Sequence, residues 1–414
     1  MPARASLVEA YVIEWLELVF RWLHLLAGIA WIGASFHFVL VDNALQPPQP
    51  DEGKAGIKGH FWAIHGGGVY RFSKYRLAPE RWPDNLHWSK WEAYTTWLTG
   101  SALMVLIYYY QSQVYLIGSD KWLQDPDSAV AISLAFVIVG VGTYEGLIRS
   151  PLRRYPLLFS LIMGMLVLLL SWLAVQIFAD RAAFIHVGAV LGSIMAGNVF
   201  FGIIPAQRQF VSAVLAGTEP DQSIADAAKQ RSFFNNYFTL PVLFCMISNH
   251  YPFIYGHSLS WLALFLIMIA GAIGRHYFNR RHQGENRYEY LIVAALLMFT
   301  VAFVLIGRDV KIGATESLQG ATTALSADRP EDDHIRHLLQ IHCAGCHAQV
   351  PSTAGFVSAP SGLIFETLGQ LGKQRRTAFI AITTGYMPLG NLTRLSLADR
   401  QLLLDWLRLQ EPGL

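Results

Sequence analysis

Long apolar segments recur along this chain, and they limit its fold more than any other feature of the sequence. A helix that crosses the hydrocarbon core of a bilayer needs about 20 largely apolar residues. Candidate membrane-spanning helices of this kind are residues 15–41, 95–117, 129–148, 156–178, 182–204, 233–250, 259–278 and 288–306. Only 14% of the residues are charged, against about a quarter in soluble domains. We therefore expect an integral membrane protein with an all-α fold, built mainly as a bundle of eight transmembrane helices.

A second signal lies in the C-terminal part, where Cys343, Cys346 and His347 form a Cys-x-x-Cys-His motif. This is the attachment motif of a c-type haem, in which the two thiols bind the porphyrin and the histidine ligates the iron. Met387, in a loop rich in Pro and Gly, is the expected second axial ligand, and His/Met ligation suits an electron carrier. A redox pair or half of a zinc site would use the same cysteine spacing, and Met387 could simply pack against a core. We expect a small class I-like cytochrome c domain over residues 331–414.

The cytochrome domain predicts an orientation, because c-type haem is attached outside the cytoplasmic membrane. With eight spans, the protein would cross a bacterial cytoplasmic (inner) membrane with both termini in the periplasm. The positive-inside rule is an independent test, because Lys and Arg favour cytoplasmic connections. The connections expected on that side hold Lys54, Lys58, Arg71, Lys74, Arg76, Arg81, Lys90, Arg149, Arg153, Arg154, Arg208, Lys229, Arg231, Arg275, Arg280, Arg281 and Arg287. The N-terminal tail and the periplasmic connections hold Arg4, Lys121 and Arg181.

The expected domain order is a transmembrane domain over residues 1–310, a linker over 311–330 and the periplasmic cytochrome c domain. A long cytoplasmic connection at about residues 43–94 is rich in imidazole, aromatic and glycine residues. Such a loop is more often functional than a spacer, although Trp, Tyr and Lys also gather at ordinary membrane interfaces. No basic cluster interleaved with aromatic residues indicates nucleic acid binding. We expect no nucleic acid partner. The apolar spans of the larger domain should instead be surrounded by membrane lipid.

Histidines within the candidate spans are possible haem ligands, because ionisable groups at membrane depth are costly and often functional. We predict one or two non-covalent haem b groups, with His24 paired with His186 and His37 paired with His276. The alternative is structural: the small residues near His24 and His186 could form ordinary helix-packing seams. Each imidazole would then bond a neighbouring carbonyl.

Four stretches resemble the bacterial membrane-bound urate oxidase (urate hydroxylase) family. They are residues 21–33, residues 65–68, residues 86–96 and the haem motif with Met387, and the resemblance covers essentially the whole chain. It implies that urate is hydroxylated to 5-hydroxyisourate without formation of hydrogen peroxide. It further implies that the electrons leave through the c-type haem to the respiratory chain, by way of a downstream cytochrome c or terminal oxidase.

A urate site near the long cytoplasmic connection would need donors for a planar anion, a counter-charge and a base for the attacking water. Backbone N–H groups of a glycine run can bind an anion as a nest, and an imidazole titrates near neutral pH. The candidates are His60 and His65 as base, Gly66, Gly67 and Gly68 as the nest, and Arg71 and Lys74 as counter-charges. The glycine run could equally be a flexible turn.

The position of the acceptor leaves a second location open. A cytoplasmic urate site would be separated from the c-type haem by a hydrocarbon core of roughly 30 Å. Either membrane haems bridge that distance, or urate binds on the periplasmic half, near His24, His186 and His250. Two other functions also remain: an electron-transfer subunit that oxidises quinol or a partner, and a transporter with a cytochrome module as redox sensor.

Overall fold

The computed structural model describes residues 2–118, 121–306, 330–353, 356, 359–383 and 385–409. The predicted linker falls almost entirely outside the described residues, since only residue 330 is included. The helices of the larger part are α1 (Pro2–Asn43), α2 (Pro50–Lys54), α3 (Trp91–Leu103), α4 (Ser112–Tyr115), α5 (Pro126–Arg149), α6 (Pro156–Ile177), α7 (Asp180–Gly197), α8 (Ile204–Leu215), α9 (Gln222–Ile247), α10 (Pro252–Tyr255), α11 (Ser260–His282) and α12 (Glu289–Ile306). Two π-helical segments, Met104–Tyr109 and Asn198–Ile203, follow α3 and α7.

Five of the expected spans are confirmed as helices long and apolar enough to cross a membrane. They are Tyr11–Asn43, Pro126–Arg149, Pro156–Ile177, Asp180–Leu215 and Ser260–His282. The chain is therefore a multi-pass membrane protein. The other three expected spans are also helical, in α3 with α4, in α9 and in α12. These helices are shorter, interrupted or more polar, so the count of eight spans stays a prediction.

The structure is mostly helical, as the all-α prediction expects, and the exception is the long connection, where β1 (Ile57–His65) and β2 (Gly68–Tyr75) form an antiparallel hairpin. The strands are rich in the aromatic and β-branched residues that favour a pleated sheet. His65 pairs with Gly68 across a two-residue turn, in which Gly66 and Gly67 have φ angles of +56° and +80°. A type I′ turn requires positive φ at both positions, which glycine adopts without strain.

The packing of the bundle centres on α7, which is the most buried of the five candidate spans, whereas α1 is the least buried. Helix α7 packs against α5, α6 and α9. A side chain at Gly188 on α7 would bring its Cβ to 2.6 Å from the Cβ of Cys245 on α9. Small residues that let helices approach closely are typical of membrane helix packing. Cys245 is accordingly fully buried.

The C-terminal part forms a small helical unit of its own, called the C-terminal unit below. It contains α13 (Pro330–Leu339), α14 (Leu368–Lys373), α15 (Arg375–Thr383) and α16 (Leu397–Leu409). Helix α13 packs against α14 and α16 around a core that includes Leu339 and Leu403. Ser396 caps α16 by accepting from the backbone N–H of Asp399 at 3.0 Å, as its spacing predicts.

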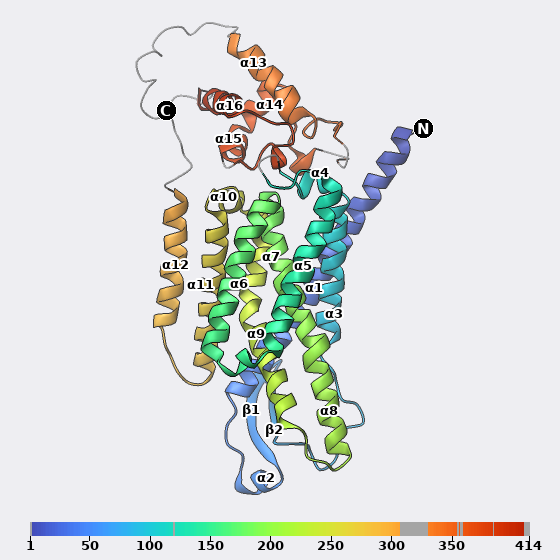
Figure 1. Cartoon of the computed structure of the whole chain (residues 1–414), viewed down its shortest axis with the longest axis vertical. Helices are drawn as coiled ribbons and strands as arrows, with labels where there is room; N and C mark the ends of the chain where they lie inside the picture. Colours follow the sequence, from blue (N-terminus) through green and yellow to red (C-terminus); the bar gives the residue numbers. More distant parts are fainter. Residues whose placement is uncertain are drawn as a thin grey trace.

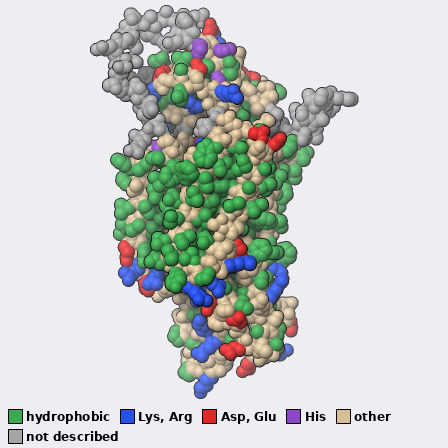
Figure 2. Space-filling model, in the orientation of Figure 1, with side chains coloured by type: hydrophobic (Ala, Val, Ile, Leu, Met, Phe, Trp, Pro, Cys, Tyr) green, Lys and Arg blue, Asp and Glu red, His purple; other side chains and the backbone are tan. Residues whose placement is uncertain are grey.

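The C-terminal unit and the β-hairpin lie at opposite ends of the bundle (Figure 1). Between them, apolar side chains cover the visible surface of the bundle as a band, and Lys and Arg side chains gather at its hairpin end (Figure 2). An apolar band bounded by charged ends is the surface that a bilayer requires. The long connection and the C-terminal unit therefore belong to opposite sides of the band.

Candidate functional site

The Cys-x-x-Cys-His motif forms a tight turn at the end of α13. The backbone N–H groups of Cys346 and His347 both donate to the carbonyl of Cys343, at 3.2 and 2.8 Å. Burial raises the pKa of the Cys343 thiol to about 12, which is the opposite of what a reactive thiolate needs. Within the described residues, no group of three or more His, Cys, Asp or Glu side chains could hold a metal ion.

His347 has the environment expected of a haem ligand. Its ring is buried and lies 5.0 Å from the ring of Phe365. Its Nδ1–H donates to the carbonyl of Leu363 at 2.8 Å. Ligating histidines usually donate their second N–H in this way, which fixes the tautomer. The other nitrogen, Nε2, makes no hydrogen bond in the described part of the chain, so it is available to an iron.

Met387 lies in a loop that is held by the helices on either side of it. Its backbone N–H donates to the carbonyl of Ala381 at 2.9 Å. Its own carbonyl accepts from Arg400 at 2.9 Å, and the same guanidinium donates to the carbonyl of Ile382 at 2.6 Å. Arg400 therefore ties the Met387 loop to both α15 and α16.

The same loop reaches the membrane bundle through Tyr386, which packs against the core of the bundle. The rings of Tyr386 and Tyr255 are 6.0 Å apart, edge to face. Beside them is a cavity of about 270 Å³ between the bundle and the C-terminal unit. We call it the junction cavity, and its charged and aromatic lining includes Tyr115, Lys121, Asp180, Arg181, Tyr255, Tyr386 and Arg400.

The junction cavity has an excess of positive charge. Lys121 pairs with Asp180 at 2.5 Å, whereas Arg181 has no carboxylate partner among the described residues. The Arg181 guanidinium lies 5.1 Å from the ring centroid of Tyr115, and its buried Nε has no hydrogen-bond partner. The buried hydroxyl of Tyr255 also lacks a partner, and burial raises the pKa of this hydroxyl, which keeps it protonated. The cavity thus offers a cation and a neutral hydroxyl to a ligand.

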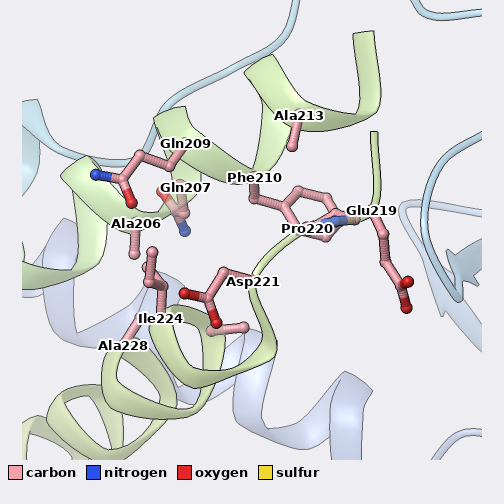
Figure 3. A pocket seen from close by; sticks show the side chains of 11 residues that line it. Ala206, Gln207, Gln209, Phe210, Ala213, Glu219, Pro220, Asp221, Ile224 and Ala228 are labelled. Carbon is pink, nitrogen blue, oxygen red and sulfur yellow. The ribbon is translucent and has the colours of Figure 1, made fainter. Parts of the chain in front are cut away.

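A larger cavity, of about 420 Å³, lies at the other end of the bundle between α8 and the start of α9 (Figure 3). Its lining includes the acidic residues Glu219 and Asp221 and contains no Lys or Arg. Asp221 also accepts from the backbone N–H of Ser223 at 2.8 Å, so it caps α9. An acidic lining without a cation does not suit an anion such as urate.

His24 and His186 form hydrogen bonds with different partners. His186 is fully buried, donates from Nδ1 to the carbonyl of Ala182 at 2.7 Å and bonds the Ser133 hydroxyl through Nε2 at 2.6 Å. His24 donates from Nδ1 to the carbonyl of Thr96 at 2.9 Å, and its Nε2 makes no hydrogen bond in the described part of the chain. Only His24 therefore keeps a nitrogen available for an iron, and the predicted haem b between the two stays a prediction.

The second predicted pair also faces different neighbours. The ring of His37 packs edge-on against Phe72 of the hairpin, with 5.5 Å between centroids. His276 bonds the Tyr237 hydroxyl through Nδ1 at 2.6 Å and lies 4.7 Å from the ring of Tyr290. The contacts of His37 and His276 are thus made with separate elements, and their role as haem ligands remains untested.

The residues predicted for a site in the long connection are distributed over the hairpin. His60 is buried, donates from Nε2 to Glu52 at 2.9 Å and contacts the Ser73 hydroxyl through Nδ1 at 3.0 Å. Glu52 also forms an ion pair with Arg71, and bonds from Arg71 and His60 lower the pKa of Glu52 to about 2. These contacts bind β1, β2 and α2 together.

The other predicted hairpin residues lie elsewhere. Lys74 pairs with Asp42 at the end of α1, at 2.6 Å. His65 is exposed next to the turn, and nothing lies within 4 Å of an added Cβ at Gly66 or Gly67. Of the predicted site residues, the structure brings His60 and Arg71 into direct contact, with Arg71 Nε donating to His60 Nδ1 at 3.1 Å. The role of the predicted site residues in binding urate stays a prediction.

Sequence reasoning did not single out Arg181, Tyr255 and Tyr386. Two signals were present. Arg181 is one of few basic residues at its end of the spans, and Tyr386 directly precedes the predicted ligand Met387. Neither signal indicates that Arg181 and Tyr386 line the same cavity, because α7 and the Met387 loop are far apart along the chain.

Comparison with known proteins identifies the larger domain. No curated protein and no solved structure matches the chain. The family model described as "Urate oxidase N-terminal" matches residues 10–306. This range contains α2 to α12 and most of α1, with the hairpin and the bundle side of the junction cavity. The match covers well over half of the chain, which therefore belongs to the urate oxidase N-terminal family.

Proposed function

We propose that this protein is a membrane-bound oxidoreductase that hydroxylates urate to 5-hydroxyisourate and passes the electrons to a c-type haem on its own C-terminal unit. The family match supports urate as the substrate. The observation that carries the proposal is the junction cavity, in which Arg181 of the family-matched bundle faces the same space as Tyr386. Tyr386 is the residue before Met387, so a substrate bound there would lie next to the haem loop.

The C-terminal unit supports the cofactor that this proposal needs. Cys343 and Cys346 would hold haem c by thioether bonds, and His347 and Met387 would ligate its iron. When bound, haem c supplies a one-electron acceptor at the surface of the protein. Two hydrogen bonds would orient the haem ligands: His347 Nδ1 donates to the carbonyl of Leu363, and Arg400 donates to the carbonyl of Met387.

The balance of the reaction explains why no peroxide is expected. Oxidation of one urate at C5 releases two electrons and two protons, and water supplies the oxygen of the new hydroxyl group. Electrons that leave through the C-terminal unit to a respiratory cytochrome c or terminal oxidase do not reduce dioxygen at the urate site. Hydrogen peroxide is then not a product.

The proposed topology places eight helices across a bacterial inner membrane, with both termini in the periplasm. It is supported by the location of the C-terminal unit and the basic hairpin end on opposite sides of the apolar band (Figure 2). It also puts the junction cavity on the periplasmic half. From a urate site in this cavity, electrons reach the c-type haem without crossing the membrane, so no cofactor is needed between the two membrane faces. A haem b at His24 would then be an additional electron acceptor.

The direct test is anaerobic addition of urate to the purified, quinone-free protein while the α-band of reduced c-type haem is followed. We expect reduction that depends on urate. A pyridine haemochrome spectrum of the same sample counts haem c and haem b per chain. Reduction by quinol but not by urate would instead support an electron-transfer subunit without an organic substrate.

A further inference from the structure

We propose that Arg181 binds the urate anion in the junction cavity, with Tyr255 donating a hydrogen bond and Tyr386 forming an aromatic wall. This inference rests on the proposed function, and it assigns the substrate to specific residues. It also places the substrate at the end of the bundle opposite the hairpin residues His60 and Arg71.

Arg181 is in contact with the Tyr115 ring but has no carboxylate partner among the described residues. A buried donor without a partner costs about 1–3 kcal/mol, and a guanidinium near the membrane normally has a carboxylate partner. Arg181 has none among the described residues, and its buried Nε is unsatisfied. The planar fork of a guanidinium matches the adjacent N and O atoms on the edge of a flat anion. A bound purine anion would satisfy both the charge and the free donor.

The aromatic residues that line the junction cavity suit a flat, polar ligand. The Tyr255 hydroxyl is buried without a partner, and the Tyr255 and Tyr386 rings meet at 6.0 Å. Aromatic faces favour flat ligands, and a tyrosine at a site adds a polar handle. The volume of about 270 Å³ lies just below the range of about 300–1,000 Å³ typical of ligand pockets. It suits one small bicyclic molecule.

The other cations of the cavity are already engaged. Lys121 is neutralised by Asp180 at 2.5 Å. Arg400 donates to two backbone carbonyls of the haem-loop region, those of Ile382 and Met387. Arg181 is thus the cation left for a ligand, and Arg400 connects the wall of the cavity to the Met387 loop.

The test is equilibrium binding of radiolabelled urate to the full-length protein, reduced with ascorbate and kept anaerobic so that no turnover occurs. Loss of a charged hydrogen bond predicts that Arg181→Gln weakens binding by about 10- to 150-fold. Arg181→Lys keeps the charge but loses the fork, so it should fall between Arg181→Gln and the wild type. Loss of a neutral hydrogen bond predicts a weakening of about 2- to 13-fold for Tyr255→Phe.

The matched control is Arg208→Gln, which removes an exposed arginine from the far end of the same continuous span. We expect its urate affinity to equal that of the wild type. An Arg181→Gln protein with wild-type affinity, or an equal loss in Arg208→Gln, would overturn the assignment while leaving urate as the substrate. If the wild type itself does not bind urate, the proposed function fails as well. The haem spectrum and elution volume of each variant check its fold, and the Arg181→Lys and Tyr255→Phe variants test the site if Arg181→Gln does not fold.

Discussion

An ion pair between a buried arginine and a carboxylate that is 24% exposed provides the sharpest prediction about stability. Arg231 on α9 makes two parallel bonds to Glu145 on α5, at 2.8 and 2.7 Å, and a third to the amide oxygen of Asn198 at 2.8 Å. Its side chain is only 8% exposed. Gly202 makes room for it, because an added Cβ would overlap the Arg231 side chain. Arg149 pairs with the same carboxylate at 2.6 Å but is 66% exposed.

We predict that Arg231→Met costs about 3–5 kcal/mol, because it leaves a largely buried carboxylate without its main partner. This lowers the ratio of folded to unfolded protein by about two to three and a half orders of magnitude. Arg149→Met removes an exposed partner of the same carboxylate and should cost about 0–1 kcal/mol. The double variant Glu145→Gln/Arg231→Met should recover part of the loss, since no unpaired charge remains.

The free energy of unfolding of each variant can be measured by SDS titration of the detergent-solubilised protein, followed by circular dichroism. We expect the free energy of unfolding to fall much more in Arg231→Met than in Arg149→Met. Equal losses for Arg231→Met and Arg149→Met would refute it, because burial would then not decide the strength of the pair. No recovery in the double variant would show that the loss comes from packing and not from the charge of Glu145.

Three further predictions concern other parts of the chain. Replacement of Cys343 and Cys346 by serine should abolish covalent haem on a haem-stained denaturing gel, while membrane insertion, checked by carbonate extraction, persists. Arg71→Gln should raise the pKa of Glu52 from about 2 towards its ordinary value of 4.5. Because the pKa of Glu52 is lowered in the folded protein, its pairing with Arg71 stabilises the hairpin above pH 4.5, and this stabilisation is lost as the pH falls towards 2. The rate of limited proteolysis of the hairpin, measured as a function of pH, tests this. Gly67→Val should destabilise the hairpin by about 1–2 kcal/mol, because the φ of Gly67 is +80°. Gly67→Asn should be tolerated, since asparagine adopts positive φ in such turns. Hydrogen exchange of the β1 amides distinguishes the two variants.

The helical framework could be predicted from the sequence because the length of an apolar segment is a local property. Segments such as 129–148 and 156–178 appear as α5 and α6 with nearly the expected bounds. The hairpin was also within reach, since alternating aromatic and β-branched residues around Gly66 and Gly67 are a known hairpin signal. Interpreting residues 57–75 as a loop overlooked that alternation.

The junction cavity could not be predicted, because it depends on contacts between distant parts of the chain. Arg181 lies at the start of α7, and Tyr386 lies in a loop of the C-terminal unit. No periodicity relates them. The same limit applies to the membrane histidines. The sequence predicts that His186 lies on a helix, but only the packing of α5 against α7 shows that the Ser133 hydroxyl occupies its Nε2.

In the proposed reaction, electrons from urate leave through the C-terminal unit and do not reduce dioxygen. The most direct measurement counts electrons during turnover of the purified protein with urate and an oxidised cytochrome c as acceptor, in the absence of dioxygen. We expect two equivalents of reduced cytochrome per urate consumed, and no hydrogen peroxide when air is admitted. Turnover that requires dioxygen and yields one peroxide per urate would contradict it.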